Sequence, residues 1–220
     1  MVAEVRLGAK ICGITRSGDA TLAVAHGAVR IGVIFAGGPR QVTVDTASRI
    51  VEAAGDVPVL AVVRPGPIAE LLDLVRATGI RGLQLHGVAP DALVGALRGE
   101  GLEVWRHVAL RPGDDVQAMV ARAAHPADAI VVEPRGHDGE SGGRGLVLDP
   151  EVAVVARAWI TSGRMVLAGG LTPETVREAI RRVQPDRVDV SSGVESAPGI
   201  KDPGRLVRFL EAVRDVRSPD

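Results

Sequence analysis

The chain has 220 residues, a length that suits one α/β domain with a full hydrophobic core. Its 26 basic and 27 acidic residues give a net charge of −1, which argues against a nucleic acid or a membrane as partner and favours a small neutral or anionic ligand. Cys12 is the one cysteine and the five histidines lack ligand-like spacing, so we expect no disulfide and no metal site.

The first ten residues carry charges too early for an apolar signal segment. No run of the chain approaches the ~18 apolar residues that a membrane span needs. We therefore expect a cytoplasmic protein, either a monomer or a homodimer, in which residues 1–220 form a single domain.

Short Val- and Ile-rich runs alternate with helix-length segments along the whole chain, which is typical of a parallel sheet. Eight such units predict a closed (β/α)8 TIM barrel. A doubly wound open sheet is the alternative, but it would leave two units over, and no GxGxxG motif follows the first run. The predicted strands are Ala9–Gly13, Ile31–Phe35, Val57–Val63, Gly82–His86, Glu103–Val108, Ala129–Glu133, Arg164–Ala168 and Arg187–Val190.

Helix start and stop signals follow several of these strands. Asp19 is expected to start a helix that ends at Gly27, and another helix is expected from Thr43 to Gly55. Pro90 with Asp91 opens a further one, and we expect Pro173 and Glu174 in the first turn of the helix after Gly170.

Active sites of such barrels lie at the C-terminal ends of the strands, so polar residues there are the candidates. The two-residue period of a strand puts Lys10 beside Cys12, and Gln84 beside His86. A lone cysteine is more often a small core residue than a base, and a lone histidine is often structural. Arg40 follows the second strand, where it either clamps a carboxylate or is solvated. Glu133 ends the sixth strand after four apolar residues, where a carboxylate is costly unless it is hydrogen-bonded or functional.

The last two strands end in residues that suit a phosphate site. Gly169 and Gly170 follow the seventh strand, and Ser191, Ser192 and Gly193 follow the eighth, with Asp189 and Ser191 on one face. Barrels commonly bind phosphate at these two loops, although an ordinary strand end with a glycine turn fits the same residues. The long connection from Pro134 to Pro150 is either a mobile loop above the barrel mouth or a surface insertion.

Six ordered motifs resemble the phosphoribosylanthranilate isomerase family of tryptophan biosynthesis. They are KICGIT (10–15), GVIFAGGPR (32–40), LQLHG (83–87), GGRG (142–145), LAGGLTPETV (167–176) and DVSSGVESAPGIKD (189–202). The resemblance implies an Amadori rearrangement of N-(5′-phosphoribosyl)anthranilate without cofactor or metal.

The resemblance also implies roles for single residues. Cys12 would be the general base, acting as a thiolate with its pKa lowered by Lys10 or a helix N-terminus. Glu133 would be the general acid in place of the family's Asp. Arg40 would hold the anthranilate carboxylate, although Gly38 replaces the family's Ser two residues before it. The remaining predicted ligands are His86 and Asp189 for the sugar and ring, and Gly169, Gly170, Ser191, Ser192 and Gly193 for the phosphate.

Two alternatives to this isomerase stay open on the sequence. The change from Asp to Glu133 fits a catalytically impaired barrel that only binds a phosphorylated metabolite. A related isomerase with other or broader phosphoribosyl substrates also fits. If Glu133 is not the acid, Asp138 and Glu140 in the long loop are the nearest replacements, and Arg144 departs from the family's Gly-Gly-Thr-Gly in the same loop.

Overall fold

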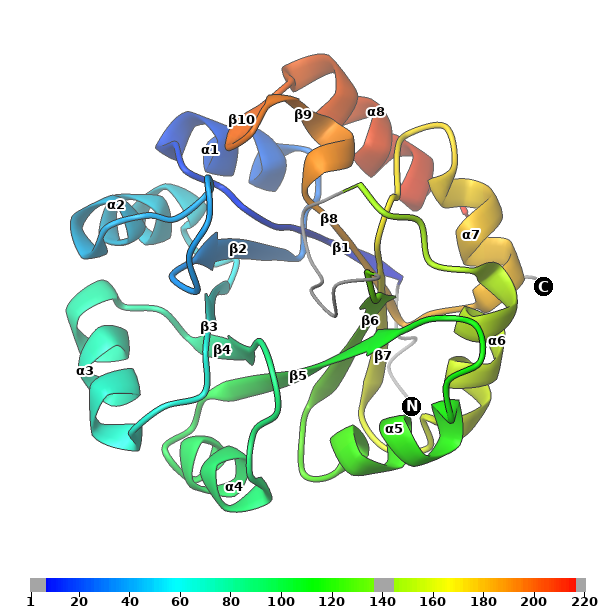
Figure 1. Cartoon of the computed structure of the whole chain (residues 1–220). Coiled ribbons are helices and arrows are strands. Elements are labelled where there is room, and N and C mark those ends of the chain that lie inside the picture. Colours follow the sequence, from blue (N-terminus) through cyan, green and yellow to red (C-terminus); the bar gives the residue numbers. More distant parts are fainter. Residues whose placement is uncertain (1–6, 137–144, 217–220) are drawn as a thin grey trace, which may run out of the picture.

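The computed structural model describes residues 7–136 and 145–216, and these form a closed barrel of eight parallel strands with helices around it (Figure 1). Each strand pairs with the next in the chain and β8 pairs with β1, so the predicted barrel is confirmed and the open sheet is excluded. The barrel strands are β1 (Gly8–Ile11), β2 (Arg30–Ile34), β3 (Val59–Val63), β4 (Gly82–Leu85), β5 (Glu103–Leu110), β6 (Ala129–Pro134), β7 (Arg164–Ala168) and β8 (Arg187–Val190). The α-helices are α1 (Ser17–Ala25), α2 (Val44–Ala54), α3 (Ile68–Thr78), α4 (Asp91–Gly99), α5 (Val116–Ala124), α6 (Pro150–Trp159), α7 (Val176–Val183) and α8 (Pro203–Arg214).

The main hydrophobic core lies between the strands and the surrounding helices. Helix α2 shows the pattern that builds it, because Ala47, Ile50 and Ala54 recur at helical spacing and are all buried. Strands such as β3 are buried along their whole length, as expected for a parallel sheet covered on both faces.

A second cluster of buried apolar residues is contributed by β3, β5, β6 and β7; it consists of Leu60, Trp105, Ala129, Val131, Val166 and Ala168. Strands β1 and β8 instead contribute the buried charges of Lys10 and Asp189, which the strand register places side by side. The Lys10 ammonium lies 5.7 Å from the centre of the Trp105 ring. Strands β1 and β8 therefore bring a buried ion pair to the side of the barrel that faces this cluster.

Two predicted helix starts are wrong by two or three residues. Helix α1 begins at Ser17, because the Asp19 carboxylate accepts hydrogen bonds from the Arg16 side chain at 2.9 and 3.0 Å and does not cap the helix. Helix α7 begins at Val176, after a turn in which the Thr172 N–H donates to Thr175 Oγ1 at 3.0 Å. The start predicted at Thr43 is confirmed, since its hydroxyl caps α2 by accepting from the Thr46 N–H.

The segment after β8 contains elements that the sequence did not predict. A short 3-10 helix, η1 (Ser192–Val194), is followed by a hairpin of β9 (Glu195–Ala197) and β10 (Ile200–Lys201). Asp202 then caps α8 by accepting from the Arg205 N–H at 2.8 Å. In the part of the chain that is described, no helix is long and apolar enough to cross a membrane.

Candidate active site

Cys12 lies directly after β1, above a buried ion pair in the barrel. Lys10 Nζ is 2.8 Å from Asp189 Oδ2, and both side chains are shielded from solvent. Burial favours the neutral amine, but Asp189 and the Cys12 thiolate raise the pKa of Lys10. A Cβ placed on Gly32 would lie only 2.9 Å from the Cys12 sulfur and from Lys10 Cε, so both side chains pack closely against β2. The expected grouping of Lys10 with Cys12 is confirmed.

The electrostatic surroundings of the thiol differ from the sequence-based expectation. Burial raises the pKa of Cys12, and the opposing effect of the nearby Lys10 ammonium does not outweigh it. Asp189 raises the pKa further and Lys201 lowers it. The expected fall of the thiol pKa is therefore wrong, because burial, aided by the charge of Asp189, outweighs the effect of Lys10. Only a small fraction of Cys12 is a thiolate near neutral pH.

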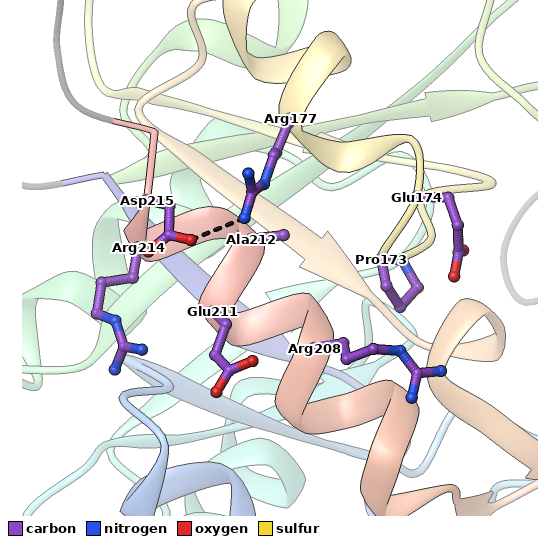
Figure 2. A pocket seen from close by; sticks show the side chains of 8 residues that line it. All are labelled: Pro173, Glu174, Arg177, Arg208, Glu211, Ala212, Arg214 and Asp215. Carbon is purple, nitrogen blue, oxygen red and sulfur yellow. Dashed lines mark hydrogen bonds and ion pairs between the residues drawn. The ribbon is translucent and has the colours of Figure 1, made fainter.

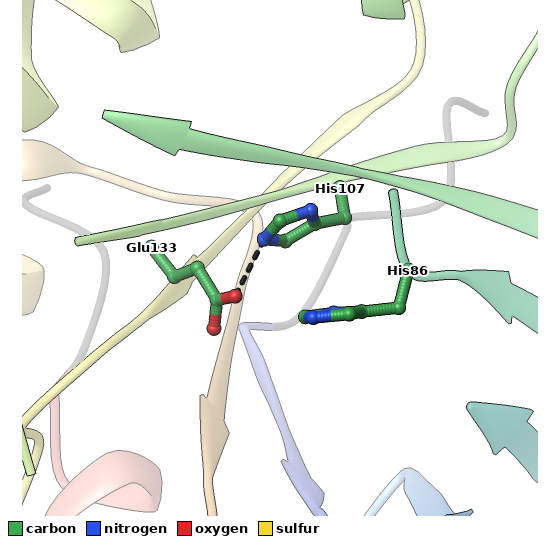
Figure 3. Close-up of side chains that lie close together, drawn as sticks. All are labelled: His86, His107 and Glu133. Atoms are coloured by element: carbon green, nitrogen blue, oxygen red, sulfur yellow. Dashed lines mark ion pairs between the residues drawn. The ribbon is translucent and has the colours of Figure 1, made fainter. Parts of the chain in front are cut away.

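Glu133 sits near the end of β6, as predicted, and is buried against two histidines. Its Oε1 is 2.5 Å from His107 Nε2, and the rings of His86 and His107 lie against each other with centroids 4.4 Å apart (Figure 3). Burial lowers the pKa of His86, His107 and Arg64 lower it further, and Glu133 opposes them. His86 is thus neutral at physiological pH.

These three side chains are also the group, within the described residues, whose ligand atoms come close enough for one metal ion. The atoms all lie within 4.8 Å of one another. A tetrahedral ion with ligands at about 2.0–2.2 Å would hold neighbouring ligand atoms about 3.3 Å apart. The 2.5 Å between His107 Nε2 and Glu133 Oε1 is shorter than this, so the two atoms are too close together to share an ion in that geometry. We therefore interpret the group as a close contact between His107 and Glu133, with His86 packed against the His107 ring.

Arg40 is placed at the mouth by the loop after β2, but its guanidinium is partly engaged. Nε and Nη2 form a fork onto the Glu195 carboxylate at 2.7 to 3.1 Å, and Lys201 Nζ donates to the same carboxylate at 2.8 Å. Burial acts to raise the pKa of Glu195, but the effect of Arg40 and Lys201 is larger, so this pKa is lowered. Nη1 of Arg40 donates no hydrogen bond within the described residues, so one end of the guanidinium is free for a ligand. The alternative of a solvated Arg40 is wrong, because the side chain is buried.

The loops after β7 and β8 meet, as a phosphate site requires. A Cβ on Gly193 would lie 1.8 Å from the Leu171 carbonyl oxygen, so these two loops touch at a point that has space only for glycine. Gly169 and Gly170 have φ angles of 98° and 65°. Within the described residues, the N–H groups of Gly170, Ser192 and Gly193 donate no hydrogen bond. Such a set of neighbouring backbone donors is suited to binding an anion.

Three buried polar atoms on different strands or strand ends also lack a hydrogen-bond partner among the described residues. They are Gln84 Oε1 on β4, Asp189 Oδ1 on β8 and Ser191 Oγ after β8. A buried polar group without a partner is costly, and native proteins rarely keep one unless a ligand or water satisfies it. We interpret these atoms as partners for the hydroxyl groups of a polar substrate.

A surface groove lies between α7 and α8. Its lining includes Arg177, which pairs with Asp215 at 2.7 Å, and the side chains of Arg208 and Glu174 (Figure 2). It lies between two outer helices and shares no residue with the group around Cys12. We assign it no role in the reaction.

Sequence reasoning missed His107 and Glu195, which come from parts of the chain far from their partners. The signal that could have found His107 is the alternation of buried and half-buried residues along β5. The signal for Glu195 is that it is the one carboxylate in the segment that leads to Lys201. Asp138, Glu140 and Arg144 lie outside the described residues.

Comparison with known proteins identifies the architecture. The family model described as N-(5′phosphoribosyl)anthranilate (PRA) isomerase matches residues 9–212. The N-(5′-phosphoribosyl)anthranilate isomerase of Cereibacter sphaeroides is 36% identical over 210 residues, covering 93% of this chain and 97% of that protein. The phosphoribosyl anthranilate isomerase of Thermus thermophilus has a TM-score of 0.83 at 31% identity, over 96% of this chain and all of that one.

A further solved isomerase was crystallised with reduced 1-(o-carboxyphenylamino)-1-deoxyribulose 5-phosphate; it is 28% identical, with a TM-score of 0.81 over 96% of this chain and 100% of that one. These similarities extend over nearly the whole barrel, including the strand ends that carry Cys12, Glu133 and the two glycine loops. The protein described here therefore belongs to the N-(5′-phosphoribosyl)anthranilate isomerase family.

Proposed function

We propose that this protein converts N-(5′-phosphoribosyl)anthranilate into 1-(2-carboxyphenylamino)-1-deoxyribulose 5-phosphate, an isomerisation of tryptophan biosynthesis. The observation that carries the proposal is that Cys12 and Glu133, a thiol and a carboxyl group, stand at strand ends of one barrel. Beside them, two loops have backbone N–H groups that donate to no partner among the described residues. The reaction only moves hydrogen within the substrate, so the balance of electrons requires no redox cofactor.

Glu133 acts first, as the general acid. Its carboxyl group gives a proton to the furanose ring oxygen while the bond from that oxygen to C1′ breaks. The nitrogen lone pair forms the C1′=N bond, which leaves an open-chain iminium ion. A positioned acid of this kind contributes about 10²- to 10⁴-fold to the rate.

Cys12 acts second, as the general base. The iminium ion makes the C2′ proton acidic, and the Cys12 thiolate takes it to leave an enolamine that rearranges to the ketone. Because burial raises the thiol pKa, the thiolate is scarce at neutral pH but is a stronger base when it forms. Lys10 favours the thiolate through its positive charge.

The other predicted residues bind the substrate in this proposal. Backbone N–H groups of Gly170, Ser192 and Gly193, with Gly169 and Ser191 shaping their loops, receive the phosphate. The free end of the Arg40 guanidinium receives the anthranilate carboxylate, in an orientation fixed by Glu195.

His86 and Asp189 complete the pocket around the sugar. The ring of His86 is neutral, and the unpartnered Asp189 Oδ1 is available to accept from a sugar hydroxyl. The choice between monomer and homodimer and the cytoplasmic location stay predictions.

Complementation of a tryptophan auxotroph that lacks this isomerase tests the function. We expect growth with the wild-type chain and none with Cys12→Ser. A second assay follows the loss of substrate fluorescence with the purified protein. We expect the same rate with and without excess chelator. Failure of the wild-type chain in both assays would reject the isomerase in favour of a barrel that only binds a phosphorylated metabolite.

A further inference from the structure

We infer that Lys201 is a positioning residue for the substrate, which links Arg40 to the loop after β8 and compensates the negative charge of Glu195 between them. The inference rests on the proposed function, because it concerns the groups proposed there to bind the substrate carboxylate and phosphate. Lys201 is one of two lysines among the 26 basic residues of the chain, and its side chain is fully shielded from solvent. A buried ammonium is costly unless it is paired.

The hairpin of β9 and β10 brings Lys201 to Glu195. The two residues are partners in the antiparallel pairing, where opposite residues project to the same face. Lys201 Nζ donates to Glu195 Oε1 at 2.8 Å, and the two side chains are 0% and 4% exposed. The Lys201 N–H donates to Asp19 Oδ2 at 3.3 Å, which holds the hairpin beside α1 (Figure 1). Both the backbone and the side chain of Lys201 are therefore fixed.

Glu195 connects Lys201 to Arg40. Its carboxylate accepts from Lys201 and also from Nε and Nη2 of Arg40 at 2.7 to 3.1 Å. Two cations thus share one carboxylate, so the three side chains together keep an excess of positive charge. Burial lowers the pKa of Lys201, and the charge of Glu195 opposes that shift. Without Lys201, Glu195 would neutralise Arg40, and the site would attract the substrate carboxylate less strongly.

The same ammonium holds the backbone of the loop after β8. Lys201 Nζ donates to the Ser191 carbonyl oxygen at 3.1 Å, and the Val194 N–H donates to this oxygen at 3.4 Å. A peptide unit is planar and trans, so the carbonyl of Ser191 and the N–H of Ser192 point in opposite directions. By binding the carbonyl on one side, Lys201 turns the Ser192 N–H to the other side. Lys201 therefore fixes the direction of one proposed phosphate donor.

The carboxylate-binding and phosphate-binding groups approach each other at Gly13. A Cβ on Gly13 would lie 2.7 Å from Arg40 Cδ and 2.8 Å from Ser191 Oγ, so this glycine lies against both side chains. Gly13 directly follows Cys12, the proposed base. A fixed separation between the two groups orients the sugar carbons of the substrate toward Cys12. Such positioning matters for the rate, because a misplacement by ~1 Å can cost ~10²-fold.

Lys201→Met tests this role, because it keeps an unbranched side chain of similar length and removes the charge. We expect kcat/KM to fall roughly 10- to 100-fold, mostly through a higher KM, as for the loss of a hydrogen bond to a charged group. Calorimetric binding of the reduced product analogue should weaken by a similar factor. Both are measured well below the melting temperature of the variant, where a loss of stability alone leaves the constants of the folded protein unchanged.

The matched control is Arg30→Met. It breaks the half-buried ion pair of Arg30 with Glu103 at the starts of β2 and β5, away from the strand ends that carry the site. This variant should lower the melting temperature and leave kcat and KM unchanged.

A double variant separates the charge of Lys201 from its link to Ser191. Lys201→Met/Glu195→Gln removes both charges, so no carboxylate neutralises Arg40. We expect its kcat/KM to be about threefold or more above that of Lys201→Met, and about threefold or more below wild type because the link to Ser191 stays broken. Equal values for the double variant and Lys201→Met would overturn the compensation of charge by Lys201.

The outcomes distinguish this inference from the proposed function. An inactive wild-type chain would reject the proposed function. An active wild-type chain with unchanged constants in Lys201→Met would reject only the positioning role of Lys201. Should Lys201→Met not fold, judged by its melting curve, the double variant decides, and wild-type constants for it would overturn the role.

Discussion

Gly193→Ala tests whether the contact between the loops after β7 and β8 builds the phosphate site. The φ angle of Gly193 lies outside the left-handed region, so alanine is compatible with the backbone itself. The obstacle is steric, because the added Cβ would lie 1.8 Å from the Leu171 carbonyl oxygen and 2.9 Å from its carbon. Both obstructing atoms belong to the backbone and cannot rotate away.

The size of the effect follows from this distance. Cβ contacts below 3.0 Å are essentially never found, so one loop must withdraw by about 1.2 Å. Misplacement of a binding group by ~1 Å can cost ~10²-fold in activity. Overpacking of this kind also destabilises a protein by about 1–3 kcal/mol, which for a chain of this size lowers the melting temperature by roughly 2–12 °C.

Steady-state fluorescence kinetics and calorimetric binding of the reduced product analogue give the readouts. We expect a KM at least tenfold higher, weaker analogue binding and a lower melting temperature. Gly95→Ala is the matched control, since Gly95 is exposed in α4 with nothing within 4 Å of its added Cβ, and it should keep wild-type kinetics. A KM for Gly193→Ala within twofold of wild type would refute the idea that this contact sets the phosphate site.

Three further results are expected. Cys12→Ser should reduce kcat by ~10²-fold or more with analogue binding kept, since an alcohol is a far poorer base, and a residual rate above about a tenth would remove Cys12 from the role. Arg40→Lys should lower kcat/KM because a lysine cannot hold the substrate carboxylate with two parallel N–H groups. Glu195→Gln should lower kcat/KM less, because it keeps the Arg40 guanidinium. Wild-type kinetic constants for Arg40→Lys would contradict the role of Arg40 in binding the carboxylate. Asp189→Asn removes a negative charge that raises the pKa of Cys12, and it frees Lys10 to lower that pKa. The pH midpoint of Cys12 alkylation by iodoacetamide should therefore move to lower pH. An unchanged midpoint would contradict this electrostatic account.

The order and nature of the barrel strands could be predicted because they depend on local patterns. The bounds of β7 and β8 match the expected Arg164–Ala168 and Arg187–Val190, where buried runs are limited by turn residues. The start of α1 was predicted wrongly because the Asp19 carboxylate accepts from the Arg16 side chain and the Lys201 N–H and does not cap the helix. The start of α7 was predicted wrongly because residues 172–175 form a turn whose N–H groups bond to the Thr172 hydroxyl before the helix begins. The β9–β10 hairpin is too short to leave a periodic signal.

The residues of the site also fall into those that local patterns predict and those that depend on tertiary contacts. Local sequence was enough to place Lys10 and Cys12 on one face and to put Glu133 and the paired glycines at strand ends, because strand period and turn chemistry are properties of neighbouring residues. The pairing of Arg40 with Glu195 and the contact of Glu133 with His107 depend on folding, because each joins residues from different strands or loops. The raised pKa of Cys12 likewise comes from burial and from the pairing of Lys10 with Asp189, a residue 179 positions away in the chain. Closure of the barrel sets these partners and removes their water, and no local pattern carries that information.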